Sequence, residues 1–306
     1  MSHTVGAFAS GISSPTNLEV GPDGALYYLA SGSGGQVFRV SAMPGVLANI
    51  STRASVETGE GVAIAGFIVT GTDSKTVVLR GLGPTLTGAG VTGVLADPTL
   101  QLFDGSGHPM WFNDNWKDTQ QTQIQNLGLA CAGAACQPPN DLESAILQIL
   151  QPGNYTAILS GKNGTTGVAL VEVYDIATGA TSHLTNISTR GLVKTANDVM
   201  IAGLIVQSRN EQVIVRALGP TLTNFGITGP LADPSLSLID ANGTLLAFND
   251  NWKNTQQAEI TATGKAPPDD RESAIMRTLV PGNYTAVVRG MNNTTGLALV
   301  EVYALQ

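Results

Sequence analysis

The sequence contains few charged residues and no long hydrophobic run. Charged residues make up only 12% of the 306 residues, about half of the share in an average soluble domain. Lysine and arginine total 15 against 23 acidic residues, so the formal net charge is −8, and no basic run occurs. Because nucleic-acid binding needs clustered Lys and Arg, this composition argues against such a partner. The longest apolar stretches, such as GVALVEVY from Gly167, are strand-sized and too short for a membrane helix.

Catalytic motifs are also absent from the sequence. It holds no GxSxG, HExxH or phosphate-binding loop, and His3, His108 and His183 have no counterparts in the internal repeat described below. His108 lies in the turn-like stretch GSGHPM, where a solvated turn residue explains it. We therefore expect a protein without enzymatic activity and without a cofactor, apart from calcium as discussed below.

The chain has only two cysteines, Cys131 and Cys136, in the stretch CAGAAC. A redox CxxC motif has two intervening residues rather than four, and a metal site needs more ligands than these two. We predict a disulfide in an exposed loop, which would place the chain in an oxidising compartment. The start, MSHTVGAFASG, shows no secretory signal, so we expect a cytosolic chain or a mature or excised piece of a longer one.

The main feature of the sequence is a long internal repeat. FNDNWKDTQQ from Phe112 returns as FNDNWKNTQQ from Phe248, and RGLGPTLTGAG, ESAI, PGNYTA and ALVEVY each have a later partner in the same order. The spacing between partners falls from 137 residues to 129 at Glu143 and Glu272. The segment that shortens holds both cysteines, so that loop is an elaboration of the first copy.

Each copy reads as short strands separated by turns. VAIAGFIV and TVVLRGL are rich in β-branched residues, and LQLFDGSGHPMWF and LSLIDANGTLLAF alternate around Asp-Gly or Asn-Gly, a strong hairpin signal. At most a short helical turn fits between Trp116 and Glu143. The pattern predicts an all-β protein with two tandem, jelly-roll-like β-sandwiches at 45–177 and 182–306.

Residues 1–44 precede both copies and hold three strand-like runs in SSPTNLEVGPDGALYYLASGSGGQVFRV. This stretch resembles one blade of the β-propellers of NHL-repeat and PQQ-dependent sugar dehydrogenase-like proteins. A single blade cannot close a propeller, so the resemblance implies a partial blade or hairpin left from a larger protein. Its apolar strands need cover, either from the first sandwich or from a second copy, and we expect self-association into a homo-oligomer or filament.

The run from DPTLQLFD through FNDNW to PGNYTAILSGKNGTTGVALVEVY resembles the bacterial pre-peptidase C-terminal (PPC) domains of secreted proteins. The resemblance implies a non-catalytic, extracellular or cell-surface β-sandwich that in some members binds calcium. Acidic residues at the hairpins are the candidate calcium ligands, since calcium prefers several carboxylate oxygens: Asp104, Asp114, Asp240 and Asp250. The alternative, which we favour, is that these side chains cap turns while Trp116 and Trp252 anchor the motif.

Arginines and carboxylates also recur in both copies: Arg53, Arg80, Arg190 and Arg216 with Asp97, Asp233, Glu143 and Glu272. They either recognise a carboxylate or sugar, or form structural Arg–carboxylate pairs, and we favour pairs. The sequence as a whole predicts a non-catalytic extracellular structural or adhesion module that self-assembles through its N-terminal strands. The alternative is a carbohydrate-binding accessory module of a larger, PQQ-dehydrogenase-like sugar-active enzyme, with a glycan as partner, although aromatics are only 5%.

Overall fold

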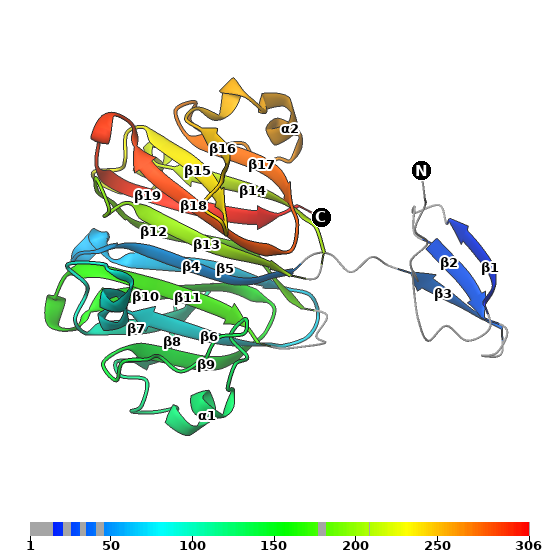
Figure 1. The fold of residues 1–306 in the computed structure, drawn as a ribbon, viewed down its shortest axis with the longest axis horizontal. Coiled ribbons are helices and arrows are strands. Elements are labelled where there is room, and N and C mark those ends of the chain that lie inside the picture. The colour runs from blue at the N-terminus through cyan, green and yellow to red at the C-terminus, as the bar shows by residue number, and fades with distance from the viewer. Residues whose placement is uncertain are drawn as a thin grey trace. The chain divides into compact units, whose positions relative to one another are not determined.

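The computed structural model describes residues 15–20, 26–30, 35–40, 46–176, 182–207 and 209–305. The chain divides into two compact units, Met1–Pro44 and Gly45–Gln306 (Figure 1). The all-β prediction is confirmed, because the α-helices of the described residues are the short α1 (Gln121–Asn126) and α2 (Gln257–Ala262). None of the helices in the described ranges is both long and apolar enough to span a membrane.

The first unit contains a three-stranded antiparallel sheet formed by β1 (Pro15–Val20), β2 (Leu26–Ala30) and β3 (Gln36–Val40). Leu18 pairs with Tyr28 and Tyr28 with Phe38, so these side chains share one face. The rings of Tyr28 and Phe38 stack at 5.1 Å. On the same face, Leu18 and Val20 are 61% and 66% exposed. The likeness of this sheet to a propeller blade stays a prediction.

The second unit holds both repeats, and each contributes the same series of eight strands. The strands of repeat 1 are β4 (Val46–Val56), β5 (Ala63–Thr70), β6 (Lys75–Leu82), β7 (Pro98–Asp104), β8 (Pro109–Asn113), β9 (Ser144–Leu150), β10 (Gly153–Gly161) and β11 (Gly167–Asp175). Those of repeat 2 are β12 (His183–Val193), β13 (Met200–Gln207), β14 (Glu211–Leu218), β15 (Pro234–Asp240), β16 (Leu245–Asn249), β17 (Ser273–Leu279), β18 (Gly282–Gly290) and β19 (Gly296–Ala304).

Each repeat has the strand order of a jelly roll. In repeat 1, one half-sheet runs β8-β7-β10-β5 and the other runs β4-β11-β6-β9. Repeat 2 repeats this order with β16-β15-β18-β13 and β12-β19-β14-β17. The first two strands of each repeat therefore lie at one side of its sandwich, where an isolated jelly roll has open edges.

Those edges join the two repeats. Strand β4 pairs with β13, and β12 pairs with β5, both antiparallel. The half-sheets thus fuse into two eight-stranded layers, β16-β15-β18-β13-β4-β11-β6-β9 and β8-β7-β10-β5-β12-β19-β14-β17, which the pairing of Leu192 in β12 with Ser55 in β4 links into one 16-stranded sheet. Ile50 pairs with Leu204 and Ile187 with Phe67, and each member of one pair is the repeat counterpart of a member of the other. The joint therefore has two-fold pseudosymmetry, and the division of this unit into separate domains at 45–177 and 182–306 stays a prediction.

The pseudo-two-fold axis runs between β4 and β12, where residues face their own counterparts. The Thr52 and Thr189 hydroxyl oxygens lie 2.8 Å apart in a buried hydrogen bond. A Cβ built on Gly191 would lie 2.9 Å from the Cβ of Ala54. Lys194 Nζ donates to Glu57 Oε1 at 2.6 Å. Glu57 and Lys194 occupy equivalent positions with opposite charge. Joining repeat 1 to repeat 2 therefore brings unlike charges together, whereas joining two copies of the same repeat would bring like charges together.

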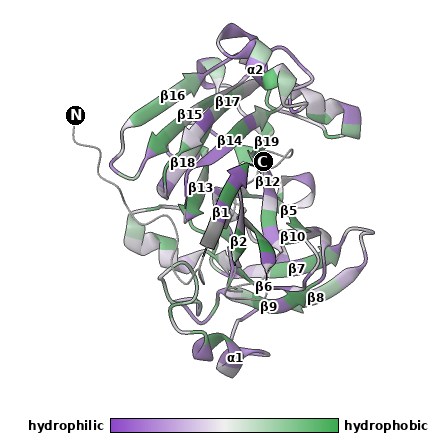
Figure 2. Cartoon of the chain, turned by 90° about the vertical axis from the view of Figure 1, so that its right-hand side faces the viewer, coloured by the Kyte–Doolittle hydropathy of each residue, from purple (hydrophilic) through white to green (hydrophobic). Residues whose placement is uncertain are grey.

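A single apolar core lies between the two sheets and includes residues of both repeats. Strand β5 illustrates how a strand contributes to this core. Its alternate residues Ala63, Ala65, Phe67 and Val69 are buried, because every second side chain of a strand points to the same face of the sheet. In Figure 2 the strands carry most of the hydrophobic colour, while α1 is largely hydrophilic. Sharing this core couples the stability of one repeat to that of the other.

A second, smaller apolar cluster covers the outer face of β6 and β9 in repeat 1. There Trp116, Ile124 of α1, Cys131 and Cys136 pack on Val78. The two cysteines are joined in a disulfide whose side chains are buried, while Gly133, Ala134 and Ala135 between them are exposed, as expected for an exposed loop. The loop folds back on the sheet because its apolar side chains cover the β6 surface.

Replacing both Cys131 and Cys136 by alanine is expected to lower the free energy of unfolding by roughly 2 kcal/mol while the fold is kept. The loss of loop-closure constraint sets this magnitude, and repeat 2 covers the same face without a disulfide through Trp252 and Ile260. Urea unfolding followed by circular dichroism measures the change. Loss of the native β spectrum in the double variant would contradict the expectation.

Candidate functional site

The duplicated FNDNW…TQQ motif closes the outer edge of β9. Asn113 Oδ1 accepts the Ala145 N–H at 2.8 Å. Two residues further along β9, the Leu147 N–H donates to Gln120 Oε1 at 2.9 Å, and Gln120 Nε2 donates to the Leu147 carbonyl at 2.9 Å. Amide side chains thus replace a neighbouring strand at an edge that would otherwise invite pairing.

Repeat 2 repeats these contacts. Asn249 Oδ1 accepts the Ala274 N–H at 2.9 Å, and Gln256 makes both bonds to Met276 of β17 at 2.9 and 3.0 Å. The near-identity of the two motifs therefore has a structural cause, the need to cap one edge strand in each repeat.

A buried glutamate connects three of the repeated blocks in each copy. Glu143, with no exposed surface, accepts the N–H groups of Gly83 and Thr85 at 3.0 and 2.9 Å and the Thr85 hydroxyl at 2.7 Å. Its carbonyl accepts the Trp116 N–H at 2.8 Å. Pro84 between the two donors has no N–H to satisfy, and a Cβ on Gly83 would lie 2.0 Å from the Leu95 carbonyl oxygen. Glu143 thus fixes the LGPTL loop.

Glu272 holds the corresponding loop of repeat 2 in the same way. It accepts the N–H groups of Gly219 and Thr221 at 3.0 and 2.9 Å and the Thr221 hydroxyl at 2.8 Å. Within the described residues neither glutamate forms an ion pair with arginine, so the Arg–carboxylate pairs expected for Glu143 and Glu272 were wrong. Backbone donors fill that role because each glutamate starts an edge strand beside the loop.

The arginines of β6 and β14 have other carboxylate partners. Arg80 Nε donates to Glu172 at 2.7 Å and its Nη1 to the Ala135 carbonyl at 2.7 Å, while the Tyr174 hydroxyl donates to Glu172 at 2.9 Å. Burial, followed by the charge of Glu172, raises the pKa of Tyr174. Sequence reasoning missed this trio because Glu172 lies in the repeated strand sequence ALVEVY, which reads as an apolar strand.

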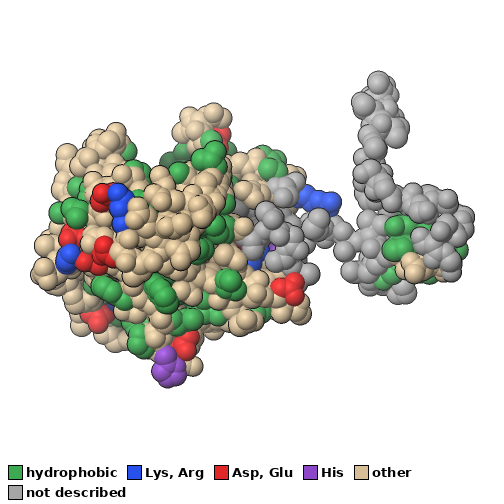
Figure 3. All heavy atoms as spheres, turned by 90° about the horizontal axis from the view of Figure 1, so that it is seen from below, with side chains coloured by type: hydrophobic (Ala, Val, Ile, Leu, Met, Phe, Trp, Pro, Cys, Tyr) green, Lys and Arg blue, Asp and Glu red, His purple; other side chains and the backbone are tan. Residues whose placement is uncertain are grey.

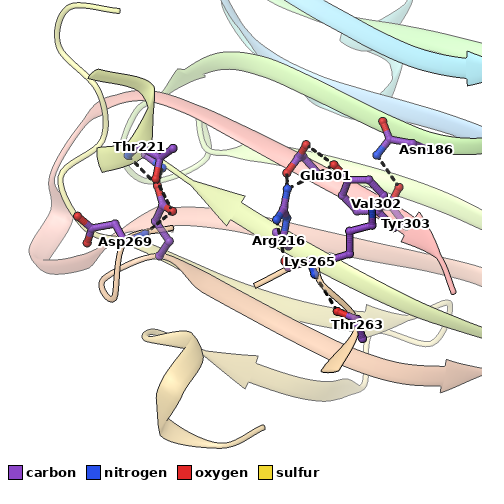
Figure 4. Close-up of polar contacts among 11 residues, drawn as sticks. Asn186, Arg216, Thr221, Thr263, Lys265, Asp269, Glu301, Val302 and Tyr303 are labelled. Atoms are coloured by element: carbon purple, nitrogen blue, oxygen red, sulfur yellow. Dashed lines mark hydrogen bonds and ion pairs between the residues drawn. The ribbon is translucent and has the colours of Figure 1, made fainter. Parts of the chain in front are cut away.

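In repeat 2, Arg216 Nε donates to Glu301 at 2.9 Å and Nη1 donates to the Lys265 carbonyl at 2.7 Å (Figure 4). Burial, then the charge of Glu301, raises the pKa of Tyr303 to about 12. Arg53 instead donates to the Asn197 carbonyl and Arg190 to Glu60, both between repeats. All four arginines therefore make contacts within the chain.

The four acidic residues predicted to bind calcium do not converge. Asp104 accepts the Ser106 and His108 N–H groups, both at 2.9 Å, and the His108 backbone bond is the main cause of its lowered pKa. Asp240 caps the second hairpin in the same way. Asp114 and Asp250 lie at the opposite ends of β8 and β16. The described residues hold no group of three or more metal-ligating side chains, and calcium binding stays a prediction.

Asp114 meets a different partner. Lys162 Nζ lies 2.6 Å from Asp114 and 3.4 Å from Asp97. In repeat 2 the equivalent carboxylates are Asp250 and Asp233, but Met291 replaces the lysine. Burial, then the charge of Asp250, raises the pKa of Asp233 above its ordinary value of 3.8. Repeat 2 thus keeps the two carboxylates without the cation between them.

Met291→Lys is expected to stabilise the protein at neutral pH, and Lys162→Met to destabilise it. With its pKa raised, Asp233 contributes stability that is present below pH 3.8 and is lost as the pH rises through its folded-state pKa. A lysine at 291 would offset that loss, so its benefit should appear only above this window. Melting temperatures of both variants from pH 3 to 8 measure it. Effects of equal size at pH 3 and pH 7 would contradict the explanation.

A shallow cavity of about 330 Å³ lies at the loop end of repeat 2. Three segments line it, namely Pro220–Asn224, Pro230–Ala232 and Pro268–Arg271. Arg271 is fixed there by two bonds to the Asp269 carboxylate at 3.0 and 2.9 Å. Repeat 1 has Asn140 and Leu142 at these positions, so the Asp269–Arg271 pair of this cavity has no counterpart there.

Comparisons with known proteins give little more. No family model matches the sequence, and no curated protein matches it. Among solved structures, it is similar to "Crystal Structure of the STIV MCP" (12% identity, 87% of this chain and 89% of that chain, TM-score 0.22). It is also similar to a structure of Sulfolobus Turreted Icosahedral Virus (11%, 85% and 88%, 0.21) and to Bacillus subtilis oxalate decarboxylase (6%, 91% and 72%, 0.15). At such low TM-scores, these similarities support no argument about fold or function.

Proposed function

We propose that this chain is a non-catalytic structural or adhesion module of an extracellular or surface protein, and that it associates with further copies through its N-terminal strands. One observation carries the proposal. The sheet of the first unit presents Leu18 and Val20 at 61% and 66% exposure beside Tyr28 and Phe38. An exposed apolar face on a three-stranded sheet is only marginally stable in water and favours association.

Two further features support the proposal. The Cys131–Cys136 disulfide is typical of proteins exposed to an oxidising environment. The titratable side chains that recur in both repeats, such as Glu143 and Arg80, are occupied by contacts that hold loops and strands together. These residues fit a scaffold better than a reaction centre.

Light scattering of the full chain and of a chain lacking residues 1–44 tests the proposal. The second unit keeps its complete core in the shortened chain, so the comparison isolates the N-terminal strands. We expect the full chain to form larger species than the shortened one, increasingly so with concentration. Two monodisperse monomers of the expected masses at high concentration would refute association.

A second candidate function, carbohydrate binding, is favoured by the cavity in repeat 2. Asn224, Asp269 and Arg271 at this cavity are side chains that hydrogen-bond hydroxyl groups, and the aromatic ring of Phe225 next to Asn224 is exposed. Isothermal titration with neutral oligosaccharides, comparing the natural chain with Arg271→Ala, tests this candidate. Equal heats for both chains would count against the cavity as a glycan site.

A further inference from the structure

The outer edges of the two sheets differ in how they are closed. Strands β9 and β17 are capped by the amides of Gln120 and Gln256, as described above. Strand β16 is held by Arg277 of β17 in the opposite sheet, whose Nη1 donates to the Leu246 carbonyl at 2.8 Å. In repeat 1, Gln148 stands in place of Arg277. Within the described ranges, the side chain that hydrogen-bonds the β8 backbone belongs to Gln101 on the neighbouring strand β7, whose Nε2 donates to the Trp111 carbonyl at 3.0 Å. It does not come from the opposite sheet, as Arg277 does.

Compared with β16, which exposes two large apolar side chains, Leu245 and Phe248, strand β8 exposes three. Its consecutive residues Met110, Trp111 and Phe112 are 41%, 37% and 54% exposed, and the strand PMWFN carries no charge. Figure 3, which views the second unit from the repeat 1 end, shows apolar side chains on this face among few charged groups. Exposed, uncharged apolar edge strands pair readily with other strands.

We infer that β8 is a docking edge for β8 of a second copy of this chain, joined antiparallel about a two-fold axis near Trp111. Within the chain, edge strands of the two repeats already join antiparallel, β4 with β13 and β12 with β5. An antiparallel pair centred on Trp111 places Met110 beside the partner copy's Phe112 and brings no like charges together. The contact would extend the sheet that begins at β8 across two molecules.

This inference rests on the proposed function only in that both involve further copies of the chain; the surface is different. Because β8 spans five residues, the contact is small and the dimer should be weak and dependent on concentration. An N-terminal contact and a β8 contact together would link copies into an open chain, whereas β8 alone gives a closed dimer.

Sedimentation equilibrium of the full chain over roughly 1 µM to 1 mM tests the inference. The background is Leu18→Lys/Val20→Lys, which makes the N-terminal face charged, and to it are added Phe112→Lys or the matched control Phe248→Lys on β16. We expect a concentration-dependent dimer in the background and with Phe248→Lys, and a monomer with Phe112→Lys. A background that stays monomeric, or a dimer that survives Phe112→Lys, would overturn the inference.

Tryptophan fluorescence of the unsubstituted chain gives a second readout that needs no variant. Trp116 and Trp252 are buried, and Trp111 is partly exposed, so quenching by iodide reports on Trp111. Docking at β8 should reduce quenching as the concentration rises, and unchanged quenching across dimer formation would overturn the β8 assignment. If the unsubstituted chain assembles while the background is monomeric, the proposed function stands and the β8 inference fails. Equal dimers in both would leave β8 standing and remove the N-terminal role.

Discussion

Glu143→Ala is expected to lower the free energy of unfolding by about 4 kcal/mol, because the substitution leaves buried donors without an acceptor. The Gly83 and Thr85 N–H groups both point at this carboxylate, and the Thr85 hydroxyl adds a third bond. The residue has no exposed surface, so water cannot replace these bonds without opening the loop. Chemical denaturation of the variant measures the loss.

Glu143→Gln is the control for this prediction. It keeps one acceptor oxygen and the shape of the side chain, so it should lose less than the alanine variant. Glu272→Ala in repeat 2 should lose a similar amount, because Gly219 and Thr221 make equivalent bonds. An alanine variant within 1 kcal/mol of the unsubstituted chain would show that these bonds contribute little.

Arg80→Ala is expected to cost about 3 to 5 kcal/mol, since it removes the cation from a buried ion pair. Glu172 would keep the Tyr174 hydroxyl but lose the guanidinium at 2.7 Å. The Ala135 carbonyl would also lose its donor, which frees the loop that carries the disulfide. Thermal and urea unfolding of the variant measure the cost.

The double variant Arg80→Met/Glu172→Leu separates the cost of an unpaired charge from that of lost packing. Replacing a buried pair by apolar residues of similar volume is often close to neutral, so the double variant should recover most of the stability. A double variant as unstable as Arg80→Ala would mean that packing or the Ala135 contact accounts for the effect.

The sequence was sufficient to predict the local structure. The repeated blocks, the alternation in LQLFD and LSLID and the Asp-Gly and Asn-Gly turns predicted strands and hairpins, because these depend on neighbours in the chain. The turn-capping interpretation of Asp104 and Asp240 agrees with the bonds they accept. The pairing of Cys131 with Cys136 required only their short separation.

Long-range pairing was beyond the sequence. Nothing local indicates that β4 joins β13 rather than ending an isolated sandwich, because an edge strand and a central strand share the same alternation. The expected calcium ligands Asp104 and Asp114 are near in sequence, yet strand β8 separates them. One sequence signal could have identified the ion pairs of Asp97 and Asp114. Lys162 of repeat 1 corresponds to Met291 in the otherwise similar repeat 2, and such a difference between repeats indicates that the local interactions differ.

Shared sheets and a shared core make the two repeats one folding unit. The pseudo-two-fold contacts Thr52–Thr189 and Glu57–Lys194 and the joint core predict that neither repeat unfolds without the other.

Differential scanning calorimetry of the unsubstituted chain, Glu143→Ala and Glu272→Ala measures whether the two repeats unfold together. We expect one transition for the second unit, with equal calorimetric and van't Hoff enthalpies, and either variant should lower its temperature. Two transitions, one moved only by Glu143→Ala and the other only by Glu272→Ala, would contradict it.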